Sequence, residues 1–407
     1  MQAFFLKIAA VILSALTSIT SMFAPLTFQI AQPNFEKAKS FDAVVYEEGT
    51  QLIPEKDENG DWTFTTDREL KVLQLSDIHI GGGLLSMKKD AMALNCVAAM
   101  ITAEKPDLVV LTGDMVYPVP FQAGTFNNEV STLMLIELME KLGVYYTVCL
   151  GNHDSEAYSI YDRAYISGLY ANPELKYSIY QPGPDDVDGY GNQVIKVKNS
   201  QGLISYAIFV IDSHDYTDGD ILGIQWKYDN VHENQIEWYA QQVDLIDAYN
   251  KQTSGDENYP IFPSILFQHI PTEEHKLAWN EYVENNYQDT ENVQYVCGEL
   301  NDSGIYHGIH PDMLFETILE KGSTKALFTG HDHQNNFSVI YKGVRLGYGM
   351  SVDYLAYPGI YREGKQRGCN VIMLNTADGS YTATLENYYQ DKYPSKYEKE
   401  AVKDLAE

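Results

Sequence analysis

The sequence predicts an α/β fold built around a largely parallel β-sheet. Short apolar segments alternate with segments of helical apolar spacing from residue 71 to residue 150, which is the pattern of βαβ crossovers. Strand-like segments then dominate around residues 176–211. The 407 residues are 44% hydrophobic and 21% charged, ordinary proportions for a globular protein that buries a core.

Two segments precede this pattern. Residues 1–32 begin with one charge, Lys7, and an apolar run from Ile8 to Leu13, which is typical of an export signal. The uncharged stretch is also long enough to span a bilayer, so an uncleaved N-terminal membrane anchor is the alternative. Residues 33–69 predict a β-rich lead-in, with strands at 43–46 and 62–66 and a turn at Asn59-Gly60.

The alternating pattern predicts one large domain at residues 70–387. Within it we expect strands at 72–75, 108–111, 144–150, 206–211, 265–268 and 326–329, and helices at 87–104, 133–142, 232–250 and 311–321. Residues 272–307 form a polar, aromatic insert that we expect to be irregular. Residues 388–407 are a charge-rich tail, expected to be a solvated helix or frayed.

The charge balance excludes some classes of partner. With 28 basic and 57 acidic residues, the net charge is −29, and a nonspecific nucleic-acid binder needs a basic surface instead. The four cysteines fit neither a disulfide framework nor a CxxC zinc pattern. We expect Cys96 and Cys149 to be buried thiols, and Cys297 with Cys369 is the one pair that could form a bridge.

Polar side chains follow five of the predicted strands. In open α/β sheets, ligands bind beyond the carboxyl ends of the strands. Asp, Asn or His stands at each of these ends, in Asp77-Ile78-His79, Gly113-Asp114, Gly151-Asn152-His153-Asp154, Gln268-His269 and Gly330-His331-Asp332-His333. Carboxylate, amide oxygen and imidazole together suit Mn, Fe or Zn ions.

The spacing inside two of these motifs also favours a cluster. Asp77 and His79 are two residues apart, as are His331 and His333. On an extended backbone such pairs point the same way. The other five histidines are expected at the surface or at helix caps: His214, His232, His275, His307 and His310.

This ordered set of motifs resembles the calcineurin-like metallophosphoesterase superfamily over residues 70–385. The resemblance implies a four-layer α/β/β/α sandwich, with two mixed sheets flanked by helices. It implies one metal site made of Asp77, His79, Asp114 and His333, and a second made of Asp114, Asn152, His269 and His331. It also implies that His153 serves the leaving group and that Asp154 orients His153 or the adjoining shell.

One motif is also similar to a particular branch of that superfamily. Gly113-Asp114-Met115-Val116-Tyr117 looks like the Gly-Asp-x-x-Tyr motif of purple acid phosphatases, in which the tyrosine binds iron and a glycine replaces His79. This chain has both His79 and Tyr117. We interpret His79 as the ligand and Tyr117 as a residue that lines the site.

The resemblance implies a hydrolase of phosphate esters, in which a hydroxide bridging two transition metals, Mn, Fe or Zn, attacks phosphorus. The N-terminal segment predicts that this hydrolase is exported. We favour a small phosphomonoester as the substrate. A phosphodiesterase or pyrophosphatase with the same centre, and a non-catalytic surface interaction protein, are the alternatives. We expect an extracellular or cell-surface location, no nucleic-acid partner, and membrane attachment only through the N-terminus.

Overall fold

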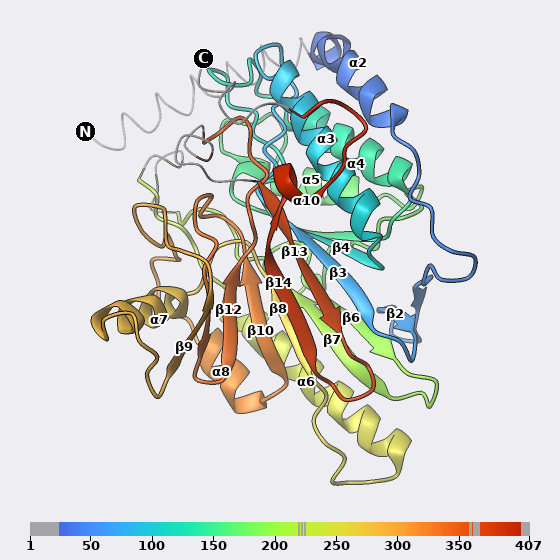
Figure 1. Ribbon diagram of the computed structural model, residues 1–407, viewed down its shortest axis with the longest axis vertical. Coiled ribbons are helices and arrows are strands. Elements are labelled where there is room, and N and C mark those ends of the chain that lie inside the picture. Colours follow the sequence, from blue (N-terminus) through green and yellow to red (C-terminus); the bar gives the residue numbers. More distant parts are fainter. Residues whose placement is uncertain are drawn as a thin grey trace.

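The computed structural model describes residues 24–218, 220, 223, 225–357, 360 and 367–399 (Figure 1). Two β-sheets form its centre. The nine-stranded sheet has the order β1-β2-β6-β7-β8-β10-β12-β11-β9, and the five-stranded sheet has the order β14-β13-β3-β4-β5. Both sheets are mixed, because parallel pairs such as β3·β4 and β7·β8 adjoin antiparallel pairs such as β13·β3 and β6·β7.

The strands have the following bounds. The five-stranded sheet contains β3 (Leu70–Leu75), β4 (Leu108–Thr112), β5 (Tyr146–Cys149), β13 (Gly368–Leu374) and β14 (Tyr381–Tyr388). The nine-stranded sheet contains β1 (Glu55–Lys56), β2 (Trp62–Thr65), β6 (Gln193–Lys198), β7 (Ile204–Val210), β8 (Ser264–Phe267), β9 (Val293–Cys297), β10 (Thr324–Thr329), β11 (Ser338–Tyr341) and β12 (Val344–Tyr348).

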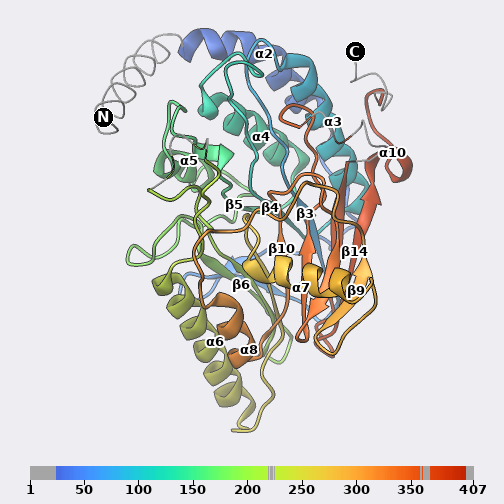
Figure 2. The ribbon, with the colours of Figure 1, turned by 90° about the vertical axis from the view of Figure 1, so that its left-hand side faces the viewer.

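Helices cover the outer faces of both sheets. One group comprises α2 (Ala24–Ser40), α3 (Met87–Glu104), α4 (Asn128–Leu142) and α5 (Arg163–Tyr170). The other comprises α6 (Glu233–Ser254), α7 (Glu273–Glu284) and α8 (Leu314–Lys321). Figures 1 and 2 show α2, α3 and α4 at the top of the molecule and α6 and α8 at its lower end.

Three apolar cores hold these layers together. One packs α3 and α4 against β3, β4 and β5, and a second packs α6, α7 and α8 against the nine-stranded sheet. The third lies between the sheets, where Val72, Leu108 and Val110 join Ile208 and Phe328. The four-layer α/β/β/α sandwich is therefore confirmed.

Most expected elements are present with small shifts at their ends. Helix α4 begins five residues before the expected helix, because the Asn127 side chain accepts a hydrogen bond from the Val130 N–H and caps an earlier start. Residues 43–46 are not a strand, although the Val44 N–H donates to the carbonyl of Leu142. The prediction that residues 272–307 are irregular is wrong in part, because this segment contains α7 and β9.

The C-terminal tail is also more ordered than expected. Tyr389 and Tyr393 are buried, and Tyr389 begins the short helix α10 (Tyr389–Lys392). The Tyr397 hydroxyl hydrogen-bonds to Ser40 Oγ at 2.6 Å, and its ring meets Phe41 edge-on. Tyrosines at every fourth position therefore fasten residues 389–397 to the body of the protein.

The export signal or anchor expected at residues 1–32 lies largely outside the described residues, of which helix α2 is the first element. Across the part of the chain that the structure describes, no helix has both the length and the apolarity needed to cross a bilayer. All four cysteines are free thiols, including Cys297 and Cys369.

A buried ion pair joins the two sheets at the edge where the polar motifs lie. Arg163 at the start of α5 donates to the carbonyls of Leu150 and Gly151, which follow β5, at 2.9 and 2.8 Å. It also binds both oxygens of Asp212, which follows β7, at 2.5 and 3.0 Å. The Asp212 carboxyl is fully buried, yet Arg163 holds its pKa below the usual value.

We expect Asp212→Ala to lower the free energy of unfolding by about 3–5 kcal/mol, because it leaves the Arg163 charge buried without its partner. Urea denaturation followed by circular dichroism measures this loss. Asp244→Ala is the matched control, since Asp244 pairs with Lys321 at the surface and its removal should cost less than about 1 kcal/mol. Equal losses in the two variants would contradict a structural role for the buried pair.

Candidate metal centre

The polar motifs meet where strands of both sheets end. Asp77 and His79 follow β3, Asp114 follows β4, and Asn152 and His153 follow β5. From the other sheet, His269 follows β8, and His331 and His333 follow β10. All seven expected metal ligands and His153 are therefore brought to one place.

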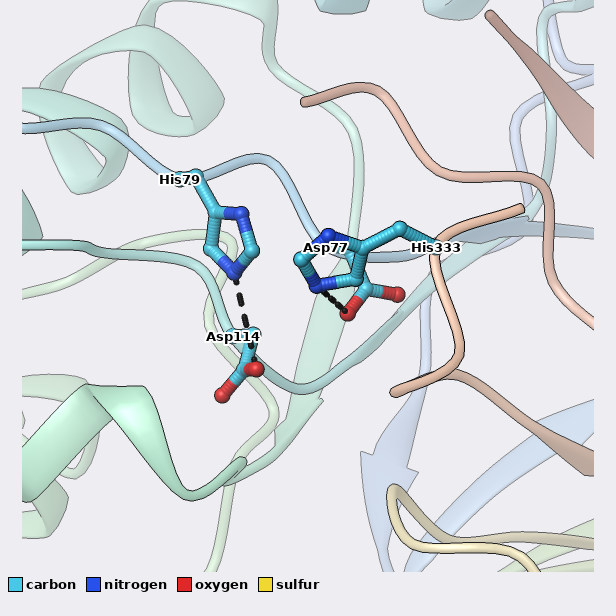
Figure 3. A group of neighbouring side chains, drawn as sticks. All are labelled: Asp77, His79, Asp114 and His333. Carbon is cyan, nitrogen blue, oxygen red and sulfur yellow. Dashed lines mark ion pairs between the residues drawn. The ribbon is translucent and has the colours of Figure 1, made fainter. Parts of the chain in front are cut away.

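The first group of ligand atoms comes from Asp77, His79, Asp114 and His333 (Figure 3). One nitrogen or oxygen of each residue lies within 4.8 Å of those of the other three. His79 Nε2 is 3.5 Å from Asp114 Oδ2, and His333 Nε2 is 3.5 Å from Asp77 Oδ1. This spacing allows one ion to contact all four side chains.

The second group shares Asp114 with the first and adds His269 and His331. His269 Nε2 lies 3.2 Å from Asp114 Oδ2 and 3.3 Å from His331 Nδ1. The same nitrogen lies 3.2 Å from Asn152 Oδ1, so the amide oxygen also faces this group. Asp114 is therefore placed between two potential ion sites, as the resemblance implies.

The sequence predicted that pairs such as Asp77 and His79 point the same way because their backbone is extended. The backbone at these ligands is not extended, so this reason is wrong. Asp77, His79, Asp114 and His331 have φ values of 51°, 54°, 55° and 76°, in the left-handed region that non-glycine residues rarely adopt. Each chain segment therefore turns sharply as it leaves its strand. Such strain persists only where the surrounding structure enforces it and concentrates at functional sites.

Two glycines permit the close approach of these turns. A Cβ atom at Gly113 would collide with the ring of His269, and Gly113 itself has a φ of 88°. A Cβ atom at Gly151 would collide with the carboxylate of Asp114. Both glycines are therefore required for close packing, and Gly113 is also required for its left-handed turn.

Asp154 holds the backbone around Asp114 rather than the His153 side chain. Its buried carboxylate accepts hydrogen bonds from the N–H groups of Asp114, Met115, Val116 and Gly151, at 2.7–3.2 Å. We therefore interpret Asp154 as a residue that supports the ligand Asp114 from outside the ligand set. This is the second of the two roles that the resemblance implies for it.

His153 is oriented by Glu156, which the sequence motifs do not reveal. His153 Nδ1 lies 2.6 Å from Glu156 Oε1, and its Nε2 is 3.9 Å from Asp114 Oδ2. The Tyr216 hydroxyl donates to Glu156 and accepts from Asn152 Nδ2, so the amide oxygen of Asn152 is turned towards the ligand groups. The His153 side chain is 22% exposed, whereas the rings of His79 and His269 are fully buried.

Tyr117 lies against the site without directing its hydroxyl into it. The hydroxyl donates to Gln122 Oε1 at 3.1 Å, while the ring packs on His79 and His153 at 5.1 and 4.8 Å between centroids. This position fits the site-lining role expected for Tyr117.

Asp353 is a second residue that the motif search missed. Its carboxylate oxygens lie 3.3 Å from His79 Nδ1 and 3.6 Å from His333 Nδ1. Although burial favours the neutral acid, these two histidines hold the pKa of Asp353 below its usual value. Asp353 follows β12, so the same strand-end argument could have found it.

The donor set fits metal ions. Asp114 Oδ2 and His79 Nε2 are buried and have no hydrogen-bond partner, which is costly for a protein unless something else satisfies them. Burial opposes ionisation of Asp114, but His269 and His153 hold its pKa well below the usual value. Two transition-metal ions need an ionised carboxylate that both can share and imidazole rings that bind in their neutral form. Asp114 and the surrounding histidines provide both.

The remaining histidines are mostly structural. His232 caps the start of α6, and its ring nitrogens bind Asp188 and Asp229 at 2.8 and 3.2 Å. His310 is exposed, as expected. His275 was expected at the surface or a cap but is fully buried in α7, where desolvation lowers its pKa to about 3.

Comparison with known proteins identifies related chains. The model of the calcineurin-like phosphoesterase family matches residues 70–335. An Arabidopsis thaliana protein named probable inactive purple acid phosphatase 14 is 28% identical over 315 residues, which are 72% of this chain and 73% of the relative. Phosphatase DCR2 of Saccharomyces cerevisiae is 22% identical, over 77% of this chain and 51% of its own. The crystal structure of a Danio rerio dimetal phosphatase aligns with a TM-score of 0.47 and 12% identity, covering 81% of this chain and 99% of that one.

We expect Asp353→Asn to weaken metal binding at the first group by about 10- to 100-fold, because His79 and His333 lose the carboxylate that orients them. The second group should keep its affinity, since Asp353 does not contact it. Metal titration with competing chelators, and metal analysis after dialysis, distinguish one weakened site from two. Unchanged binding at both groups would remove Asp353 from the metal centre.

Proposed function

Because the chain belongs to the calcineurin-like phosphoesterase family, we propose that it hydrolyses a phosphate ester with two metal ions bound at this centre. The observation that carries the proposal is the convergence of two ligand groups on Asp114. Asp77, His79 and His333 would hold one ion with Asp114. Asn152, His269 and His331 would hold the other.

The ions would supply positive charge for the phosphoryl oxygens and a water activated near neutral pH. They would also attract an anionic substrate to a chain whose net charge is −29. The protein contributes the fixed positions of the ligands. Asp154 holds the Asp114 turn through four backbone N–H groups, and Asp353 holds two imidazoles.

His153 is the residue best placed to act on the leaving group. Its Nδ1 is fixed by Glu156, which leaves Nε2 free to face substrate, and its side chain reaches the cavity beside Asp114. Burial alone would lower the pKa of His153, but the carboxylates of Asp114 and Glu156 raise it above its usual value. A protonated ring can donate a proton to the leaving group.

A phosphomonoester is the favoured substrate, with a phosphodiester or a pyrophosphate as the alternative at the same centre. The purple-acid-phosphatase-like motif at Gly113–Tyr117 and the names of the Arabidopsis relatives support this choice. Those relatives are named probable inactive, which favours a non-catalytic role as the second candidate. The complete donor set and the oriented His153 favour catalysis in this chain.

Export is proposed from the sequence of residues 1–32, with a location outside the cell or on its surface. Detecting the segment before Pro25 in membrane and medium fractions tests whether this segment is cleaved or retained. Recovery of the protein, with or without this segment, in neither fraction would contradict export.

The proposed reaction is tested with purified protein, p-nitrophenyl phosphate and bis-p-nitrophenyl phosphate. We expect hydrolysis of the monoester to be faster, to be lost on chelation, and to return on addition of Mn, Fe or Zn. Metal analysis of the same sample gives the occupancy. Absence of hydrolysis with two ions bound per chain would instead support the non-catalytic role.

We expect His153→Ala to lower kcat by about 10²- to 10⁴-fold while both metal ions stay bound, because the variant removes a proton donor and none of the proposed ligands. The loss should be smaller for p-nitrophenyl phosphate than for an alkyl phosphate, whose leaving group needs the proton more. Measured kcat values with metal analysis check both statements. A parallel loss of metal would reassign His153 as a ligand.

A further inference from the structure

We propose that His214, Asp229 and His232 bind a Zn²⁺ ion, which ties the loop after β7 to the start of α6. None of these residues belongs to the two ligand groups around Asp114, so this third site is independent of the proposed hydrolysis. The site follows from the positions of the three donors and from the hydrogen bonds that orient the two imidazole rings.

The three side chains come from two segments that pack at the same place. His214 follows β7, Asp229 precedes α6, and His232 caps the start of α6. One nitrogen or oxygen of each residue lies within 4.8 Å of those of the other two. His232 Nε2 and Asp229 Oδ2 are 3.2 Å apart. Two ligands bound about 2.1 Å from a tetrahedral zinc ion lie about 3.4 Å apart, so this spacing suits one shared ion.

Gln235 orients the His214 ring. Its buried amide oxygen lies 2.8 Å from His214 Nε2 and also accepts the backbone N–H of His232 at 2.7 Å. The amide nitrogen of Gln235 donates to the backbone carbonyl of Asp212 at 2.7 Å, which fixes the oxygen on the side of His214. His214 Nε2 therefore carries a hydrogen. In the neutral ring the lone pair is then on Nδ1, which is left to bind an ion.

Asp188 orients the His232 ring in the same manner. Its Oδ2 atom lies 2.8 Å from His232 Nδ1, so the neutral ring donates this N–H and turns the lone pair of Nε2 towards Asp229. Histidines that bind metals commonly donate their second ring N–H to a carboxylate or carbonyl oxygen, and both rings have this arrangement. The alternative is an imidazolium that forms ion pairs with Asp188 and Asp229 without a metal.

The donor types favour Zn²⁺ over Ca²⁺ or Mg²⁺. Two imidazoles and a carboxylate suit zinc, whereas the two harder ions prefer oxygen ligands alone. The carboxylates of Asp188 and Asp229 together balance the charge of one divalent ion. The His232 side chain is 37% exposed, so water can reach the remaining coordination position.

The ion would lie at the base of a loop that reaches the candidate metal centre. The Asp229 N–H donates to the Asp215 carbonyl at 3.0 Å, and Tyr216 pairs with Tyr228 in an isolated antiparallel bridge. The rings of these two tyrosines stack at 5.3 Å, and Tyr228 also packs against His331 at 4.3 Å. An ion held at the base of this loop would therefore restrain both tyrosines beside the centre.

Equilibrium dialysis against Zn²⁺, followed by metal analysis, tests the site in the full chain. At free zinc that just saturates the wild type, we expect His214→Ala and Asp229→Ala each to hold one ion fewer per chain, because losing a ligand weakens the third site at least about 100-fold. Asp188→Ala should weaken it about tenfold, since His232 loses its orienting carboxylate. His310→Ala is the matched control, because His310 is an exposed histidine outside the cluster.

Labelling of the wild-type chain tests the same site without a variant. Diethylpyrocarbonate modifies accessible imidazoles, and mass spectrometry locates the modified residue. At a free zinc concentration ten times the dissociation constant, we expect His232 to react about tenfold more slowly, while the rate at His310 is unchanged.

Equal zinc contents in the wild type, His214→Ala and Asp229→Ala would overturn the third site. Equal labelling of His232 with and without zinc would overturn it as well. Either result would leave the ion pairs of His232 with Asp188 and Asp229 as the reason for the cluster, and it would not affect the proposed phosphoesterase function.

Discussion

The metal centre is built around one shared carboxylate. Asp114 stands between two groups of donors, and its Oδ2 atom lies within 4 Å of nitrogens from His79, His153 and His269. Its second oxygen accepts the backbone N–H of His153 at 2.7 Å. A fully buried charge in this position is stable only when cations or donors surround it, and much of the surrounding architecture supplies them. Three features bring these groups together. Asp154 accepts hydrogen bonds from the backbone around Asp114, glycines allow the turns, and the Arg163–Asp212 pair joins the sheets.

Much of the fold and the site could be predicted from the sequence, because both follow from local patterns. Strand ends are visible as apolar runs that stop at Asp, Asn or His, and these runs located all seven converging donors and His153. What escaped prediction depends on contacts between distant segments. Tyr216 matters only because its loop reaches Glu156 and Asn152, and Asp353 acts through His79, which is far from it in sequence. Glu156 is the exception, because it lies three residues after His153. Helix α7 and the packed tail were missed because both are polar and bury few side chains: His275, Ala278 and Tyr282 in α7, and Tyr389 and Tyr393 in the tail.

The names of the Arabidopsis relatives raise the question of what distinguishes an active member of such a family from an inactive one. The fold does not depend on the donors alone, since three apolar cores hold the layers together. A chain can therefore lose one ligand and keep its architecture. Activity then depends on a few side chains and on the residues that orient them, and overall identity of about a quarter says little about those positions.

The packing of Tyr397 against Ser40 and Phe41 has a mechanical consequence. It joins the first described helix to the last described segment, so the two ends of the domain are linked at its surface. A force applied to the chain before α2 would load this contact and the α2–α4 interface before it reached the strands that carry the ligands. The ligands follow β3, β4, β5, β8 and β10, so these contacts stand between the start of α2 and the metal centre.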